Sequence, residues 1–379
     1  MMDSNYKMIS EYVSILQHEI WHKTYGEDLP LEKASPNANH GESGFFHYTS
    51  LSNALKILEL KKEDDKDKVE RYNAKFISLW ASHFLFLNDT QELADGLKIA
   101  CENITAKKDS GGANDRAKEW LLQYLDYFSS IGPNDNIYNA PNSFILCFCL
   151  KGNILSQWMR YGKESGIAIE FDLDNCQYEG FSPPRPKHTR PGEPAPSIGY
   201  YEDRMEVIPR RILYADDDKT RYIKKITQKA INRNNDAVHI LAMQALAAAS
   251  FMKHPGFEDE SEVRLLFSPN YYPEHTAMDA AKLIQYRETD GILKPYMDIH
   301  IKHNDSDKKI IKSITVGPGL NQTLVLNAII KLVQTRFTGS IDPVQKFNDW
   351  DVEEEQYYKH TMIGDIEVRC STLPYRSQT

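Results

Sequence analysis

The 379-residue chain lacks the sequence features of secreted, membrane-spanning and nucleic-acid-coating proteins. No apolar run approaches the length that crosses a bilayer, and the N-terminal stretch "MMDSNYKMISEYVSILQHEI" has no apolar segment typical of a signal peptide. Basic residues are outnumbered by acidic ones, 45 to 54, and the net charge is -9. This balance argues against a broad basic surface for nucleic acid, although it leaves room for a local basic groove. We therefore expect a cytoplasmic protein without membrane contact.

Cysteine is scarce and is patterned neither for disulfides nor for metal. The count of five is odd, and no two cysteines form the CxxC pair that commonly binds zinc. Such usage is typical of free thiols in a reducing compartment. The sequence therefore predicts no metal site. The cysteines are Cys101, Cys147, Cys149, Cys176 and Cys370.

What the chain does contain is a globular composition, 41% hydrophobic and 26% charged. Strand-like and helical segments come in mixed order without regular βαβ alternation, which favours an α+β fold. We expect a mainly antiparallel sheet, either continuous or split, flanked by helices. Strands are predicted over 45–50, 75–89, 143–150, 166–172, 210–216, 262–267, 296–302, 311–319 and 364–371, and helices over 9–22, 51–62, from 88, 115–131, 218–251 and 322–337.

The expected domain organisation is simple. Residues 1–43 form an N-terminal helix and loop, and residues 44–379 form a single α+β domain. The proline-rich stretch over 180–199, "FSPPRPKHTRPGEPAPSIG" at its core, indicates an irregular insertion within that domain.

The first candidate site residue is His47, on the short aromatic strand "FFHYTS". Alternation places His47 on the same face as Phe45 and Thr49, and a helix follows directly. Free N–H groups at a helix start accept anions, so Tyr48 and Thr49 join His47 as candidate ligand contacts. The alternative is a core histidine bonded to a backbone carbonyl.

A polar group follows the next predicted strand in "FLNDTQE". Asn88 or Asp89 suits a helix N-cap with Glu92 in the first turn, where negative charge is favoured. A divalent metal is the alternative, because Asp89 and Glu92 lie three residues apart and share a helical face.

The stretch "LSQWMRYGKESG" brings together Trp158, Arg160 and Tyr161. Trp158 and Tyr161 share one helical face and can stack on a nucleobase or nicotinamide ring. The guanidinium of Arg160 can hold a phosphate or carboxylate in a forked contact. The alternative is an ordinary core pair beside a surface arginine.

Paired carboxylates occur in "FEDESEVRLLF". Glu260, Glu262 and Arg264 alternate at period two, so all three face one side of a strand. Two carboxylates so close raise each other's proton affinity unless a cation answers them, and Arg264 can be that cation. The alternative is an exposed edge strand with a surface ion pair.

The order of these motifs resembles the bacterial family catalogued as domain of unknown function 2971. The resemblance runs over residues 44–376, from "FFHYTSLSNALKIL" to "EVRCSTLPYR". The chain departs from the family pattern at Thr90, where a proline is usual, and at Val263, where an aromatic residue is usual.

More distantly, "HYTS…ALKIL" resembles the first motif of the ADP-ribosyltransferase superfamily. That resemblance implies that His47 holds the ribose of NAD and that Tyr161 stacks on nicotinamide. Glu262, or less readily Glu260, would stabilise the ribosyl cation as nicotinamide leaves. It implies NAD as the substrate, no metal, and a protein, a nucleic acid or water as acceptor. A toxin or anti-phage effector with a regulatory protein partner is the expected biological role. The expected ligand contacts are His47, Tyr48, Thr49, Asn88, Asp89, Trp158, Arg160, Tyr161 and Arg264.

Two other functions stay open. The chain can be a nucleotide-sensing or protein-binding module that uses the same pocket without turnover. It can also be a metal-dependent nuclease, with Asp89, Glu92, Glu260 and Glu262 as ligands.

Overall fold

The computed structural model describes just over half of the chain. The predicted N-terminal helix over 9–22, nearly all of the predicted helix over 115–131 and most of the proline-rich insertion lie outside the described residues. The described residues are 34, 36–58, 76–87, 91–103, 118–119, 122, 143–162, 166–182, 201–205, 207, 209–231, 245, 248–267, 282–289, 291–305, 308–338 and 360–374.

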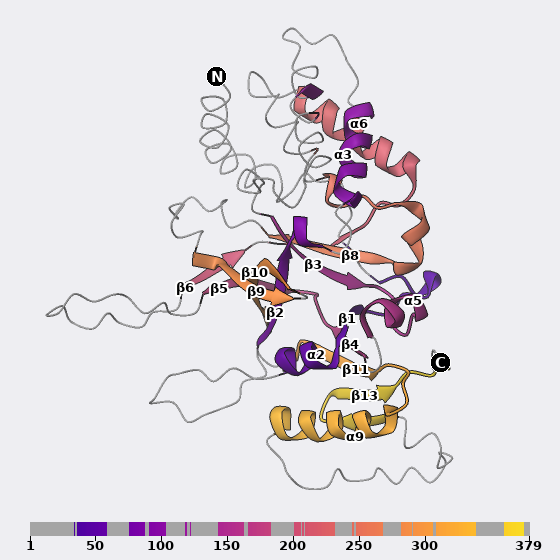
Figure 1. Ribbon diagram of the computed structural model, residues 1–379, viewed down its shortest axis with the longest axis vertical. Coiled ribbons are helices and arrows are strands. Elements are labelled where there is room, and N and C mark those ends of the chain that lie inside the picture. The colour runs from indigo at the N-terminus through magenta and orange to yellow at the C-terminus, as the bar shows by residue number, and fades with distance from the viewer. Residues whose placement is uncertain are drawn as a thin grey trace, which may run out of the picture.

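An open and mostly antiparallel sheet runs through the described part of the molecule, with helices around it (Figure 1). The main path of neighbouring strands is β12-β13-β11-β4-β1-β3-β2-β10-β5-β6, and β11 with β13 is its parallel pair. The predicted α+β class is therefore confirmed. The strands are β1 Phe45–Ser50, β2 Phe76–His83, β3 Phe144–Cys149, β4 Gly166–Phe171, β5 Cys176–Ser182, β6 Tyr201–Met205, β7 Arg210–Arg211, β8 Glu262–Phe267, β9 Ile284–Thr289, β10 Ile292–His303, β11 Ile311–Val316, β12 His360–Ile363 and β13 Ile366–Cys370.

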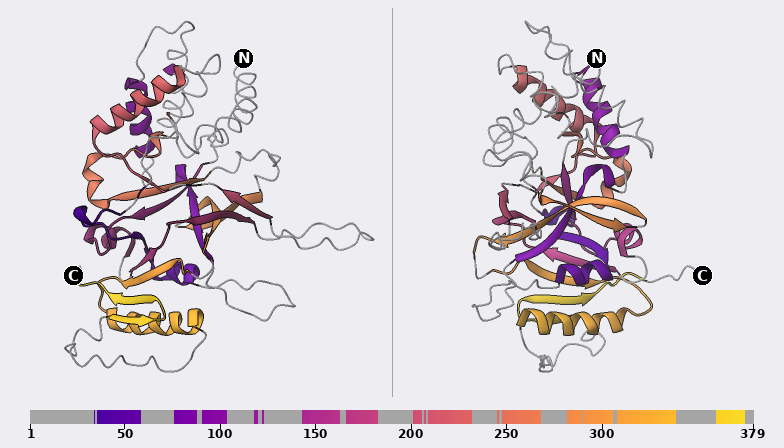
Figure 2. Two further views of the ribbon diagram at one scale, coloured as in Figure 1. Left: turned by 180° about the vertical axis from the view of Figure 1, so that it is seen from behind. Right: turned by 60° about the vertical axis from the view of Figure 1, so that its left-hand side comes forward.

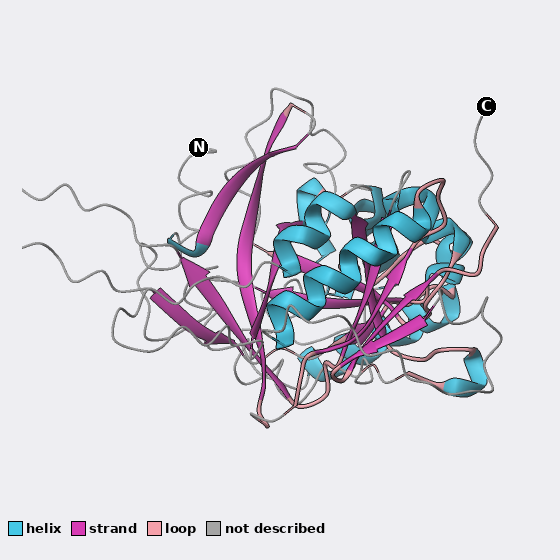
Figure 3. Ribbon diagram, turned by 90° about the horizontal axis from the view of Figure 1, so that it is seen from below, coloured by secondary structure: helices cyan, strands magenta, loops and turns pink. Residues whose placement is uncertain are grey.

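The helices pack at both ends of this sheet. Figure 2 shows the α3–α6 pair and α9 at opposite ends with the strands between them, and Figure 3 shows strands extending beyond the helices. No helix in the described part combines the length and apolar composition needed to cross a membrane. The helices are α2 Leu51–Leu58, α3 Gln91–Asn103, α5 Leu155–Gln157, α6 Asp216–Ile231 and α9 Gln322–Val333, with shorter helical turns η1 Ala38–His40, η2 Phe84–Phe86, η4 Trp158–Gly162, η5 Pro255–Glu260 and η7 Gln334–Thr338.

The main core lies on one face of the strands because apolar residues alternate along them. Phe144, Leu146 and Phe148 of β3 are buried there, next to Val263 and Leu265 of β8. Helices α2 and α9 cover the same core with their apolar faces. The other face of β3 and β8 is consequently free to carry polar side chains.

One predicted strand is much shorter than expected, and strands β5, β6, β9 and β12 were not predicted. Only Arg210–Arg211 of the strand predicted over 210–216 is a strand, because the three aspartates that open α6 favour a helix start from Asp216. The helix predicted over 218–251 is observed as α6 over Asp216–Ile231, and residues 245, 248 and 249 are also helical. Strand β9 escaped prediction because its sequence "IQYRET" is mostly polar and only partly buried.

Strands β1 and β2 share one edge of β3, and they touch it at opposite ends. Strand β8 pairs along the whole other edge of β3. On the shared edge, β1 pairs with β3 only through Phe46 and Cys149, and β2 pairs through two residues at the start of β3. Among the described residues, the middle of β3 around Cys147 therefore has no strand partner on this edge. The sheet is split at that point.

Candidate functional site

Glu262 and Arg264 face away from the core because of their register on β8. Across the β3–β8 ladder, Glu262 lies opposite Cys149 and Arg264 lies opposite Cys147. Val263 between them points into the core. The period-two spacing thus places both charges on one face, as the sequence predicts.

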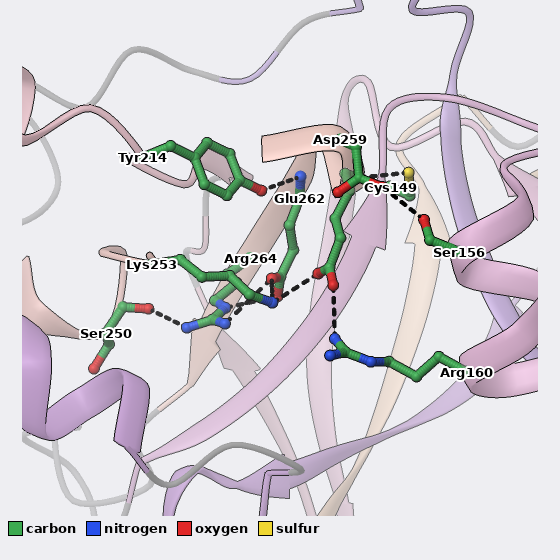
Figure 4. A network of polar contacts seen from close by, with 10 residues as sticks. Cys149, Ser156, Arg160, Tyr214, Ser250, Lys253, Asp259, Glu262 and Arg264 are labelled. Carbon is green, nitrogen blue, oxygen red and sulfur yellow. Dashed lines mark hydrogen bonds and ion pairs between the residues drawn. The ribbon is translucent and has the colours of Figure 1, made fainter. Parts of the chain in front are cut away.

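Five charged side chains meet on this face, and we call Arg160, Lys253, Glu260, Glu262 and Arg264 the charge cluster (Figure 4). Lys253 Nζ lies 2.7 Å from Glu260 and 3.0 Å from Glu262. Arg264 donates to both carboxylate oxygens of Glu262, from Nε at 2.7 Å and from Nη2 at 3.2 Å. Arg160 Nη1 lies 2.6 Å from Glu260 Oε1. Every carboxylate oxygen in the cluster therefore has a cationic partner.

The backbone before β8 explains how two glutamates reach one lysine. Lys253 precedes the short 3-10 helix η5, and Glu260 ends it. Ser261 then takes a left-handed conformation, with φ of 44°, and its N–H donates to the carbonyl of Glu258. This reversal turns the chain directly into β8, so that Glu260 and Glu262 both face Lys253.

Burial and charge act in opposite directions on Glu262. Burial alone raises the pKa of this carboxyl, but Arg264 and Lys253 together outweigh burial and lower its pKa to about 2. Glu262 is thus a carboxylate at any physiological pH. The cluster holds three cations against two carboxylates, and Arg160 is its most exposed member at 35% of its side chain.

Tyr161 and Cys147 border the charge cluster on the same face. The Cys147 thiol hydrogen-bonds to the Glu262 carboxylate, and burial keeps the pKa of this thiol well above its usual range. Burial, with Cys147 and Glu262 nearby, raises the pKa of Tyr161 to about 12. Both groups are therefore protonated, and the phenol of Tyr161 lies close to the acidic pair.

Trp158 belongs to a small second core and presents no open aromatic face. It is 3% exposed, meets Tyr48 edge-on at 4.8 Å and donates from Nε1 to Asn153. Its ring also lies over Gly317, where an added Cβ would come within 2.7 Å of it. The predicted stacking platform at Trp158 is thus corrected: the indole fills a packed space that only glycine leaves open.

Tyr48 and Thr49 are also buried, each with 6% exposure. The Tyr48 hydroxyl donates to the carbonyl of Lys151 and accepts from the N–H of Ile154. Tyr48 therefore fixes the loop that leads into Trp158, and its hydroxyl is already engaged on both sides.

His47 points to the face opposite Glu262. The row Phe46–Cys149–Glu262 crosses three adjacent strands, so His47, the next residue on β1, lies on the other side. Its Nδ1 lies 3.1 Å from the carbonyl oxygen of Cys147, and its ring packs near Phe148. Burial lowers the pKa of His47, and Arg287 of β9 lowers it further. The resemblance places His47 and Glu262 around one NAD molecule, but the register instead places their side chains on opposite faces of the sheet.

Three of the predicted residues nevertheless meet at Cys147. His47 contacts the backbone carbonyl of Cys147 at the open edge of β3. Glu262 contacts the Cys147 thiol, and Tyr161 lies close enough to that thiol for its pKa to respond. Cys147 thus joins the two faces at the point where the sheet is split.

Other predicted residues lie elsewhere. Asn88 and Asp89 fall outside the described residues, and the side chain of Glu92 on α3 is also not described. Within the described part of the chain, no group of three or more histidine, cysteine, aspartate or glutamate side chains could hold a metal ion.

Sequence reasoning missed Lys253 and Arg287. For Lys253 a signal exists, because two carboxylates at period two need more positive charge than Arg264 alone supplies. For Arg287 there is none, because its strand carries no apolar alternation.

The comparisons with known proteins bear on the same segment. No curated protein and no solved structure shows a significant match to this chain. A family model described as "Protein of unknown function (DUF2971)" matches residues 157–265, from the residue before Trp158 to the residue after Arg264. This match supports a relation of the chain to that family of unknown function, through the segment that carries the whole charge cluster.

Proposed function

We propose that this protein cleaves the bond between nicotinamide and ribose in NAD and passes ADP-ribose to a macromolecule or to water. One observation carries the proposal: Glu262, Tyr161 and His47, far apart in sequence, all contact or closely approach Cys147 at the split of the sheet. The resemblance of "HYTS…ALKIL" to the ADP-ribosyltransferase superfamily supports it, and so do the adjacent positions of β1, β3 and β8.

Glu262 suits the central role in this reaction. As nicotinamide leaves, positive charge develops on the ribose, and a fixed carboxylate stabilises that charge. Arg264 and Lys253 keep Glu262 ionised and hold its position. Tyr161, beside Glu262, is the aromatic side chain available to pack on the nicotinamide ring.

The substrate itself would free part of the cluster. Arg160 is partly exposed and lies 2.6 Å from Glu260, and a phosphate of NAD can compete with Glu260 for its guanidinium. Release of Arg160 leaves Glu260 Oε1 without its cation. Glu260 can then accept a hydrogen bond from the hydroxyl that receives ADP-ribose.

A second candidate is a nucleotide-sensing module without turnover. It is favoured by the complete pairing of Glu260 and Glu262 with cations and by the position of His47 on the opposite face. Such a module would bind a nucleotide through Arg160 and transmit the change through the charge cluster.

In the cell, the proposed activity fits a cytoplasmic toxin or anti-phage effector. Its acceptor would be a protein or a nucleic acid, and a regulatory protein would restrain it. These roles rest on the superfamily resemblance alone.

The test measures the release of nicotinamide from NAD by chromatography. The reaction is run with and without EDTA. Glu262→Gln is the key variant, and Glu258→Gln, which changes an exposed glutamate of η5 just before β8, is its matched control. If Glu262→Gln does not fold, nicotinamide release by Tyr161→Ala is compared with release by Tyr161→Phe. Only the second variant keeps the aromatic ring proposed to pack on nicotinamide.

Release that persists in EDTA, survives Glu258→Gln and falls in Glu262→Gln by about 10²–10³-fold supports the transferase. Saturable binding of NAD without any release supports the sensing module. Cleavage of nucleic acid that EDTA abolishes would instead support a nuclease and reject both proposals.

A further inference from the structure

Arg287 of β9 is held by aromatic rings and a hydroxyl. Its guanidinium carbon lies 5.3 Å from the centre of the Trp80 ring and 5.6 Å from that of Tyr296. Its Nη2 donates to Ser82 Oγ at 2.9 Å, and its Nε is buried without a hydrogen-bond partner. A buried donor without a hydrogen-bond partner raises the free energy of the folded protein. An acceptor from a ligand would lower it by bonding to Nε.

No carboxylate in the described part of the chain forms an ion pair with Arg287. Arg160, Arg211 and Arg264 each lie within 2.7 Å of a glutamate oxygen. A second cation, Lys56 of α2, lies 5.1 Å from the same Trp80 ring. Two cations near one indole repel each other, and an anion between them or close to both offsets that repulsion.

The position of Arg287 connects it with the split of the sheet. Its partner Ser82 pairs with Ile145 of β3, two residues from Cys147. From there, Arg287 is close enough to His47 to lower the pKa of that histidine. Ser82 and Ile145 lie on the same face as Cys147 and Glu262, so Arg287 approaches the open stretch of β3 from that face, whereas His47 points to the opposite one.

We propose that Arg287, assisted by Lys56, binds the diphosphate of the dinucleotide beside the open edge of β3. The inference rests on the proposed function for the identity of the ligand. Phosphate oxygens satisfy the buried Nε and complement both cations. Trp80 and Tyr296 orient the guanidinium, and the ligand reaches Cys147 from the side where β1 and β2 diverge.

The test combines calorimetric titration with steady-state kinetics. Inorganic pyrophosphate, ADP-ribose and, as a carboxylate probe, citrate are titrated into the full chain and into Arg287→Met. Lys98→Met, which removes an exposed cation of α3, is the matched control, and Arg287→Lys keeps the charge without the fork. Circular dichroism and thermal unfolding check that each variant is folded.

We expect Arg287→Met to weaken pyrophosphate and ADP-ribose binding at least about tenfold and Lys98→Met to leave both unchanged. Arg287→Lys should fall between them. Equal binding by Arg287→Met and the full chain overturns the inference, and so does tighter binding of citrate than of pyrophosphate. The inference is also overturned if Arg287→Met folds but is markedly less stable and the unmodified chain binds no phosphate. That result would mean that an acidic group of the protein pairs with the guanidinium.

The same data separate the inference from the proposed function. Phosphate binding that depends on Arg287 without nicotinamide release keeps the anion site and rejects NAD cleavage. Nicotinamide release with an unchanged KM in Arg287→Met keeps NAD cleavage and rejects the anion site.

Discussion

The charge cluster and the Arg287 group, which is Arg287 with Trp80, Ser82 and Tyr296, both lie near strand β3. They differ in what surrounds their cations. In the charge cluster, Lys253 and Arg264 are buried and each contacts carboxylate oxygens. In the Arg287 group, aromatic rings replace the carboxylates, and the described residues supply no acid. Among the described residues, every carboxylate oxygen of the charge cluster has a cationic partner, whereas Arg287 has no anionic one. Complete pairing fixes a geometry, whereas an unpaired cation marks a place for a ligand.

The largest expected effect is that of Glu262→Gln. Loss of this charge leaves Lys253 and Arg264 buried with one carboxylate fewer, which destabilises a protein by about 3–5 kcal/mol. Urea unfolding monitored by circular dichroism measures this loss. Glu258→Gln is the control and should change the free energy of unfolding by less than about 0.5 kcal/mol. Equal stability of the two variants would show that the charge cluster is not the stabilising unit inferred from its contacts.

Acid should weaken the fold through the same carboxylate. The pKa of Glu262 is lowered from 4.5 to about 2, so its contribution is fully present above pH 4.5 and is lost as pH falls toward 2. A shift of this size corresponds to about 3 kcal/mol. In Lys253→Met one of the lowering cations is gone, so the acid-induced loss should begin at higher pH. Thermal unfolding as a function of pH measures the stability of the unmodified chain and of Lys253→Met. An identical loss of stability at low pH in both proteins would contradict the effect of Lys253 on Glu262.

Arg160→Met should separate stability from binding. Its ion pair with Glu260 is partly exposed, and such pairs contribute about 0–1 kcal/mol. The proposed function nevertheless predicts a clear loss of affinity for NAD. Thermal unfolding and calorimetric titration of the same preparation measure the two effects. A large destabilisation with normal NAD affinity would assign Arg160 to the structure alone.

A similarly small effect on stability is expected for Arg287→Met. Without a carboxylate partner among the described residues, this cation contributes little to the fold, and the change should stay within about 1 kcal/mol. Arg264→Met, which leaves Glu262 with a single cation, should destabilise by about 3–5 kcal/mol. Urea unfolding of the two variants side by side is the direct measure. Similar losses would erase the distinction between the two regions.

Local patterns in the sequence predicted local structure well. Period-two spacing placed Glu262 and Arg264 on one face, and short apolar or aromatic runs gave β1, β3 and β8. The polar strand β9 carries no such pattern, so Arg287 could not be found in advance. The contribution of Lys253 depends on the turn over Pro255–Glu260, whose reversal at Ser261 is not encoded by any periodicity.

The register between strands that are far apart in the chain could not be predicted from the sequence. The face of His47 relative to Glu262 follows from two cross-strand pairs that join residues more than one hundred positions apart. A shift by one residue would place His47 on the opposite face, so no local signal decides it. The split of the sheet at Cys147 has the same origin, since it depends on where β1 and β2 each leave β3.

The most direct test of the account is the steady-state kinetics of nicotinamide release by Arg287→Met and Glu262→Gln, measured beside the unmodified chain. The account predicts that Arg287→Met raises KM for NAD about tenfold or more with kcat nearly unchanged, because its contact is made with bound substrate. Glu262→Gln should lower kcat by about 10²–10³-fold, because its charge acts in the transition state. Release at the unmodified rate by Glu262→Gln, or the same change in both parameters for both variants, would contradict it.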